Sequence, residues 1–247
     1  MEADYKEIAR QARLKILELI YNAQTSHIGS NFSCIDILTV LFEKIDLDKD
    51  RFVLSKGWVA ASLYYFLWRK GRITEEELNS FCKEGSKFIG LAEPIIPDIK
   101  IAGGSMGLGL PGAVGLALAK KIKKEPGKVY VLMSDGEMQS GTTWESGLII
   151  NHHNLDNLVV IVDYNGLQAM GKVDDILKIP IDIDIDGHDY EQIAKTLDEH
   201  SGQDFIFAKT IKGKGWKRAE GNNLYHYKGL SEEEYKEAVA ELTILHG

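Results

Sequence analysis

The chain has 247 residues, of which 44% are hydrophobic and 27% charged, a composition typical of one globular domain with its own core. A net charge of −8 argues against nucleic-acid binding, and no apolar run reaches the roughly 18 residues that a membrane span needs. Because the acidic N-terminus also lacks the apolar segment of a signal peptide, we expect a cytoplasmic protein that binds neither nucleic acid nor membranes.

The first half of the chain is predicted to be mainly helical, because apolar residues recur in it at helical spacing. We expect Ser33 and Thr74 to cap two of these helices, since their side-chain oxygens can accept hydrogen bonds from a first helical turn. Cys34 and Cys82 match no disulfide or metal spacing, so both are expected to be reduced and buried. Helices are predicted over 4–24, 33–45, 59–71 and 74–85, and a short buried strand over 51–55.

The second half alternates strands with helices. A glycine-rich loop, 102–112, leads into a helix over 113–122 that is rich in small residues. Ser231 and Glu234 have the spacing of a capping box at the start of a final helix. Strands are predicted over 128–133, 158–163 and 204–211, with a helix over 142–153 between the first two. This alternation predicts an α/β fold, a parallel sheet with helices on both faces.

Polar residues follow two strands of this predicted sheet. Asp135 comes just after one strand and Asn165 just after the next, so both are expected at the carboxyl edge, where ligands bind in open α/β sheets. With a loop carbonyl from Leu167 they would supply three hard oxygen ligands for Mg²⁺, and diphosphate oxygens and water would supply the rest. Gly136 would let backbone N–H groups approach a phosphate, and the positive end of the following helix would add to the attraction.

An ordinary strand-end turn explains the same residues. In that alternative Asp135 caps the following helix and Asn165 starts a loop, and both Asp-Gly and Asn-Gly are common turn pairs. These residues alone do not separate the two interpretations.

A longer stretch separates them. SDGEMQSGTTWESGLIINHHNLDNLVVIVDYNGLQ resembles the thiamine diphosphate motif of transketolases, which opens with Gly-Asp-Gly and closes with an asparagine on the next strand. Further stretches are similar to that family: TSHIGSNFSCIDILTVLF, DRFVLSKG, GGSMGLGLPGAVGLALA, DIDGHDYEQI and AKTIKGKGW. Residues 1–247 are therefore identified as a single diphosphate-binding domain, the N-terminal subunit of a transketolase-like enzyme split over two genes. The resemblance implies the three-layer, parallel-sheet thiamine diphosphate-binding fold.

The resemblance also implies roles for particular residues. Asp135, Asn165 and the backbone carbonyl of Leu167 correspond to the metal ligands. Gly104 and Met106 correspond to positions that contact the pyrimidine of the cofactor. Asp135, Asn165, Gly136 and Glu145 complete the expected cofactor-binding set.

Two histidines are implied to be catalytic. His27, in SHIG, and His226, in NNLYHYKG, match active-site histidines of the family, and a pKa near neutrality suits proton transfer. His188, in DGHD, is expected to be a structural turn residue.

The sequence departs from the family at several positions. Ser134 replaces the first glycine of Gly-Asp-Gly, which is acceptable where φ is negative. Trp58 replaces a histidine after Ser-Lys-Gly, and the loop 91–98 lacks a second histidine. Ser140 stands where a glutamate joins a carboxylate network between subunits, although Glu145 remains. The flat indole of Trp58 suggests a substrate that is a non-phosphorylated or nucleotide-linked sugar.

The implied activity is transfer of a two-carbon ketol unit from a ketose to an aldose, with thiamine diphosphate and Mg²⁺ or Ca²⁺ as cofactors. The glutamate that protonates the pyrimidine would come from another domain. We therefore expect a C-terminal partner subunit with a pyrimidine-binding domain, in an α2β2 assembly, besides the sugar substrates.

Two alternatives remain. The first is a transketolase-like subunit of specialised sugar or natural-product biosynthesis that acts on a non-standard sugar; deoxyxylulose-phosphate synthase fits less well, because DRFVLSKG and AKTIKGKG are transketolase-like. The second is a non-catalytic scaffold subunit, against which Asp135, Asn165 and His27 argue.

Overall fold

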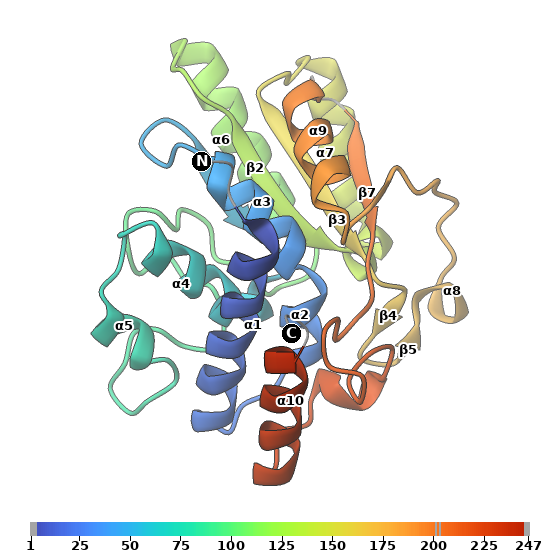
Figure 1. Ribbon diagram of the computed structural model, residues 1–247. Coiled ribbons are helices and arrows are strands. Elements are labelled where there is room, and N and C mark those ends of the chain that lie inside the picture. Colours follow the sequence, from blue (N-terminus) through green and yellow to red (C-terminus); the bar gives the residue numbers. More distant parts are fainter. Residues whose placement is uncertain (1–3, 201, 203, 245–247) are drawn as a thin grey trace.

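The computed structural model describes residues 4–200, 202 and 204–244. A five-stranded sheet in the order β1-β2-β3-β7-β6 forms its centre, and every strand pair in this sheet is parallel (Figure 1). Its strands are β1 (Arg51–Leu54), β2 (Val129–Ser134), β3 (Leu158–Tyr164), β7 (Phe205–Lys209) and β6 (Ile185–Asp186). A small antiparallel pair, β4 (Leu167–Gln168) and β5 (Gly171–Lys172), lies apart from the sheet.

The strands are buried because apolar residues face helices on both sides. On β2, Leu132 belongs to one hydrophobic core and Met133 to the other, as expected where successive side chains point to opposite faces. The first core includes α3 (Ile35–Lys44) and α9 (Tyr190–Glu199). The second includes α6 (Gly109–Lys123) and α7 (Gly141–His152). This arrangement confirms the three-layer α/β prediction.

Further helices extend the first core outward. They are α1 (Tyr5–Asn22), α2 (Ile28–Ser33), α4 (Ala60–Arg69), α5 (Glu75–Asn79) and α10 (Glu232–Ile244). Although α1 and α10 are far apart in the sequence, they lie side by side in Figure 1, and the rings of Tyr21 and Tyr235 stack with their centres 4.2 Å apart. Over the described residues, no helix is long and apolar enough to cross a membrane.

Two of the three predicted caps are confirmed. Thr74 accepts from the backbone N–H of Glu77 in a reciprocal capping box, and Ser231 forms the same box with Glu234. The prediction for Ser33 is wrong. Ser33 ends α2, and its hydroxyl donates to the carbonyl of Ser30 and to a buried carboxylate, because it faces the inside of the protein.

Several boundaries also differ from the predictions. The helix predicted over 74–85 ends at Asn79, and the chain turns at Cys82, which has a positive φ of 53°. The helix predicted over 113–122 begins at Gly109, since Pro111 is tolerated in a first turn. Helix α9 was not predicted, nor were the short elements α2 and α8 (Val173–Ile176). Both cysteines are free, as expected, but only Cys34 is buried.

Candidate functional site

A cavity of 490 Å³ lies at the carboxyl edge of the sheet. Eight of the nine residues predicted for the site line it: His27, Gly104, Met106, Asp135, Gly136, Asn165, Leu167 and His226. The ninth, Glu145, does not, because its side chain is exposed on α7. Most of the predicted site residues thus line one cavity, while their roles remain predictions.

Asp135 ties the ends of β2 and β3 together. Its Oδ1 accepts from the N–H of Gly136 at 2.8 Å, and its Oδ2 accepts from the N–H of Gly166 at 2.6 Å. The side chain is 2% exposed. Burial, together with the nearby carboxylate of Asp163, raises the pKa of Asp135 to about 7. A divalent cation beside this carboxylate would offset the cost of burying its charge.

The oxygens near Asp135 fit a hard cation. Asn165 Oδ1 accepts from the N–H of Leu167 at 3.1 Å, which shapes the turn after β3, and both residues line the cavity. Within the part of the chain that the structure describes, no three His, Cys, Asp or Glu side chains gather as a metal site. A cation here would therefore use one carboxylate, one amide oxygen and one backbone carbonyl, a set of donors that suits Mg²⁺ or Ca²⁺.

The backbone at Gly136 leaves room for a close approach. A Cβ at this position would lie 3.1 Å from Met106 Cε and 3.2 Å from Gln168 Cδ. The helix predicted over 142–153 is α7, which begins at Gly141, and a 3₁₀ turn, η2 (Asp135–Gln139), lies between it and the end of β2. The contribution of the α7 N-terminus to phosphate binding stays a prediction.

Sequence reasoning missed Glu137, whose buried carboxylate organises the turn η2. Its Oε2 accepts from the N–H of Ser134 at 2.7 Å and from the Ser134 hydroxyl at 3.0 Å. Its Oε1 accepts from Ser55 Oγ and from the N–H of Gly107 at 3.2 Å. The spacing Ser-x-x-Glu of a capping box was the available signal. Ser134 itself has a φ of −94°, so serine replaces the family glycine without strain.

A buried ion pair lies behind the cavity. Lys56 Nζ contacts Asp163 Oδ2, and the carboxylate also accepts from the hydroxyls of Ser33 and Thr210. Burial opposes the charge on Asp163, but the Lys56 ammonium and the two hydroxyls hold the pKa of this carboxyl below its usual range. Lys56 also lines the cavity. Its place in the motif Ser-Lys-Gly was the only sequence signal for it.

The two predicted histidines meet on one side of the cavity. His27 adopts a left-handed conformation, with φ 72° and ψ 22°, and its N–H donates to the carbonyl of His226 at 3.0 Å. Their ring centres lie 5.0 Å apart. Such backbone strain in a residue other than glycine is concentrated at functional sites. His226 belongs to the short turn η3 (Asn223–His226).

Burial and nearby lysines keep both imidazoles neutral. Desolvation, followed by the charge of Lys212, lowers the pKa of His27 to about 4 and that of His226 to about 3. At neutral pH each ring therefore offers one N–H donor and one acceptor nitrogen. Lys212 was not singled out from the sequence, although it lies in the noted stretch AKTIKGKGW.

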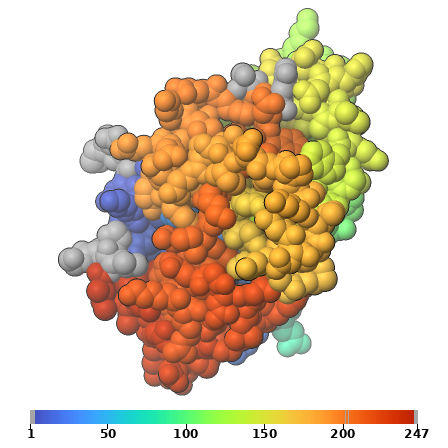
Figure 2. Space-filling model, turned by 90° about the vertical axis from the view of Figure 1, so that its right-hand side faces the viewer, coloured from blue at the N-terminus to red at the C-terminus, as the bar shows by residue number. Residues whose placement is uncertain are grey.

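The rim of the cavity is mainly apolar. Trp58, in the turn η1 (Gly57–Val59), lines the cavity at the position where the resemblance places a histidine. Leu91 also lines the cavity, and it belongs to the loop 91–98, which lacks the second histidine. Figure 2 shows the segment after β3 beside the segment after β7 on one face of the molecule, and Asn223 Nδ2 donates to the carbonyl of Ala169 across this junction. The rim residue Met170 follows directly and is 78% exposed.

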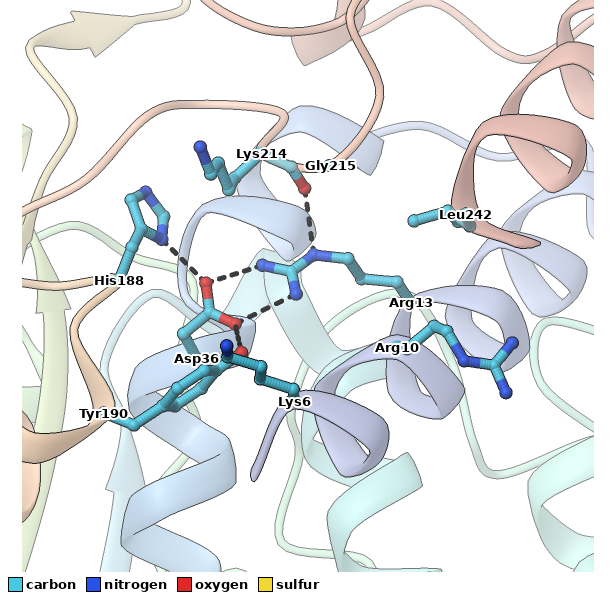
Figure 3. Close-up of a pocket in the computed structure, with 9 residues that line it drawn as sticks. All are labelled: Lys6, Arg10, Arg13, Asp36, His188, Tyr190, Lys214, Gly215 and Leu242. Atoms are coloured by element: carbon cyan, nitrogen blue, oxygen red, sulfur yellow. Dashed lines mark hydrogen bonds and ion pairs between the residues drawn. The ribbon is translucent and has the colours of Figure 1, made fainter. Parts of the chain in front are cut away.

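A second cluster supports the loop after β7 (Figure 3). Asp36 accepts two hydrogen bonds from the guanidinium of Arg13, at 2.9 and 2.7 Å, and others from Tyr190 OH and His188 Nδ1. The other ring nitrogen of His188 accepts from the N–H of Ile211 at 2.8 Å. His188 is a turn residue with a structural contact, in agreement with the sequence prediction. The cluster therefore fixes one end of the loop that carries Lys212.

Comparison with known proteins places this geometry in a family. Residues 5–244 match the transketolase family of thiamine diphosphate-binding domains. One subunit of an apulose-4-phosphate transketolase from Phocaeicola vulgatus is 32% identical over 255 residues, which cover 94% of this chain and 91% of that protein. One subunit of a 6-deoxy-6-sulfo-D-fructose transketolase from a Clostridium species is 31% identical over 266 residues, covering 98% and 97%.

A solved structure agrees with the sequence relatives. Transketolase from Campylobacter jejuni superposes with a TM-score of 0.91 and 29% identity, covering 98% of this chain but only 43% of that protein. These findings confirm the resemblance and the interpretation as one subunit of a split enzyme. The chain belongs to the transketolase family, as a thiamine diphosphate-binding subunit of about the same length as its relatives from split transketolases.

Proposed function

We propose that this chain is the diphosphate-binding subunit of a cytoplasmic, two-subunit transketolase that transfers a two-carbon ketol unit from a ketose to an aldose. The observation that carries the proposal is the shared cavity, in which Asp135, Asn165 and Leu167 lie with His27 and His226 at the carboxyl edge of the sheet. Residues 1–247 would act together as one diphosphate-binding domain.

The proposed cofactors are thiamine diphosphate and Mg²⁺, or Ca²⁺ in its place. Asp135, Asn165 and the carbonyl of Leu167 would hold the cation, and the close backbone approach at Gly136 would admit the diphosphate. Gly104 and Met106, which also line the cavity, would contact the pyrimidine. When bound, thiamine diphosphate would supply the nucleophile and the electron sink that ketol transfer needs.

The protein's own part in the reaction is to bind and orient the sugar. His27 and His226 are neutral at physiological pH and would form hydrogen bonds to sugar hydroxyl and carbonyl oxygens. Trp58 and Leu91 would exclude water from the rim.

Both the comparison with one-chain enzymes and the surface of the chain support a partner subunit. The chain spans less than half of the one-chain Campylobacter transketolase, so the pyrimidine-binding domain would be supplied by a second protein. Large apolar side chains are exposed on the rim of the cavity, at Met170, and elsewhere on the surface at Leu108, before α6, and at Trp144 and Leu148, one turn apart on α7. Burial of such side chains stabilises association, so we propose that the partner covers them in an α2β2 assembly. Glu145 follows Trp144 on α7 and would lie in this interface.

The proposed substrates are sugars other than those of the pentose phosphate reactions. Two relatives are named for apulose-4-phosphate and for 6-deoxy-6-sulfo-D-fructose, and both are subunits of about this length. The indole of Trp58 in the cavity, where the family has a histidine, favours a donor or acceptor that differs from those of the pentose phosphate reactions. A nucleotide-linked sugar is the second candidate on the same ground.

The test starts from native co-purification of the chain from its own cell, with the bound protein identified by mass spectrometry. The recovered pair is then assayed with thiamine diphosphate and Mg²⁺ against a panel of phosphorylated and non-phosphorylated ketoses. Ketol transfer by the pair, and none by either protein on its own, is the expected result. Transfer by the single chain would contradict the two-subunit proposal, and an active pair in which Asp135→Ala changes nothing would contradict the proposed site.

Trp58→His is the matched variant for the substrate proposal. It restores the family residue without touching the proposed metal ligands. An unchanged substrate profile in this variant would refute the role given to the indole.

A further inference from the structure

Lys212 is buried directly behind the cavity and touches three acceptor atoms. Its Nζ lies 2.8 Å from His226 Nδ1 and 3.3 Å from both the carbonyl of Leu167 and Asn223 Oδ1. The orientation of the Asn223 amide follows from its Nδ2, which donates to the carbonyl of Ala169 at 3.0 Å. The three acceptors match the three N–H groups of a lysine ammonium.

This arrangement determines which nitrogen of His226 carries the proton. An ammonium can donate but not accept, so the nitrogen that it touches, Nδ1, must present a lone pair. The proton of the neutral ring is then on Nε2. We infer that Lys212 is a positioning residue that fixes His226 in this tautomer, so that His226 offers an N–H donor to a ligand in the cavity that it lines.

The second histidine has no such constraint. His27 Nδ1 lies 2.8 Å from the hydroxyl of Ser26, which can donate or accept, so either tautomer of His27 is compatible with its neighbour. The two imidazoles are therefore not equivalent. His226 is set as a donor, while His27 is free to adapt to the oxygen that it meets.

The backbone around Lys212 is held at several points, which keeps the ammonium in place. The N–H of Ile211 donates to His188, and the carbonyl of Lys214 accepts from Arg13 Nε at 2.9 Å. The Lys212 stem packs against Gly29, where an added Cβ would lie 3.3 Å from Lys212 Cγ. Asp36 binds both Arg13 and His188 (Figure 3). It thus supports Lys212, and through it His226, by fixing the loop.

The consequence for the reaction rests on the proposed function. A fixed N–H donor stabilises negative charge that develops on a substrate oxygen, and the positive charge of Lys212 behind the ring strengthens that donor. No proton leaves His226 in this role, so no base is needed to restore it. The tautomer itself is a property of the chain and can be measured without cofactor, metal or partner.

The experiment is long-range ¹⁵N–¹H correlation NMR of histidine-labelled chain at neutral pH, with His226 assigned by His226→Gln. We expect Nδ1 to appear as the unprotonated nitrogen and Nε2 as the protonated one. Lys212→Met keeps the length of the side chain but removes the donor, and should shift His226 toward the other tautomer or a mixture of both. Lys212→Arg retains a side chain that can only donate and should restore the parent pattern. Lys214→Met, in the same loop, should leave it unchanged.

Two results overturn the inference. One is a parent chain whose His226 carries its proton on Nδ1. This result is obtained on the unmodified chain, so it does not depend on whether a variant folds. The other is a folded Lys212→Met chain with an unchanged His226 pattern. Failure of the proposed function is a separate result, because an inactive complex can still show the Nε2 proton, and an active one can lack it. In an active complex, Lys212→Met should lower kcat at least tenfold, and Lys212→Arg should recover part of the loss.

Discussion

Replacing the carboxylate at the end of β2 should stabilise the isolated chain while removing its response to cations. The pKa of Asp135 is about 7 in the folded chain, against an ordinary value of 3.8 for an aspartate in an unfolded one. A difference of about 3 between these pKa values corresponds to about 4 kcal/mol. Because the folded pKa is the higher one, this residue favours folding at low pH, and that contribution is lost as the pH rises through 7.

Asp135→Asn removes the charge but also changes the hydrogen bonds. The asparagine oxygen can accept from Gly136 or from Gly166, whereas the carboxylate accepts from both. The buried N–H group that is left without an acceptor costs about 1–3 kcal/mol. Subtracted from the gain of about 4 kcal/mol, this leaves a net increase of about 1–3 kcal/mol in the free energy of unfolding at pH 8 in EDTA. At pH 5.5 the parent is largely protonated at this site, and the gain should disappear.

Urea unfolding of parent and variant, at both pH values and with or without Mg²⁺ and thiamine diphosphate, tests this reasoning. The parent should be stabilised by the ligands at pH 8, and Asp135→Asn should not. Asp163→Asn is the control, and its expected effect on stability is the opposite one. It leaves the buried Lys56 without its carboxylate and should destabilise the chain at both pH values. If Asp135→Asn were no more stable than the parent at pH 8, or kept the response to Mg²⁺, the reasoning would be refuted.

Three further outcomes can be measured on the chain alone. Lys56→Met should lower the free energy of unfolding in urea by about 3–5 kcal/mol, since it leaves the buried charge of Asp163 without its lysine. The double change Lys56→Met with Asp163→Leu should lower it less than Lys56→Met alone, because no buried charge is left. Gly107→Ala should lower the melting temperature, because φ is 78° and the new Cβ would lie 2.5 Å from Ser140 Cβ, whereas Gly147→Ala, with nothing within 4 Å, should be neutral or stabilising. Thr74→Ala should cost about 1 kcal/mol by removing a capping box, and an unchanged stability would contradict the cap.

Much of the fold was predictable because the central strands of the sheet correspond to continuous runs of apolar residues in the sequence. Strands β2 and β3 consist of such runs, and the helices between them follow from periodic apolar positions. Helix α2 was not predictable in the same way. Its first turn depends on the left-handed conformation of His27, which a contact with His226, distant in the sequence, maintains.

The site was predicted where topology alone brings residues together. Asp135 and Asn165 follow neighbouring parallel strands, so their meeting at one edge required no knowledge of side-chain packing. Lys56 with Asp163, and Lys212 with His226, pair across segments that no local pattern connects. Glu145 was carried over from the family; it is exposed on α7 and does not line the cavity.

The backbone contact between His27 and His226 has a consequence for protein synthesis. The carbonyl of His226 accepts from the N–H of His27, and α10, the last helix described, packs on α1, the first. During translation the helices around His27 leave the ribosome long before these later partners do. The carboxyl edge of the sheet is therefore completed only once η3 has emerged, and until then a nascent chain lacks the side of the cavity that His226 lines. A ribosome that stalls before Asn222 yields a product that keeps Asp135, Asn165 and Leu167 but lacks η3 and its histidine.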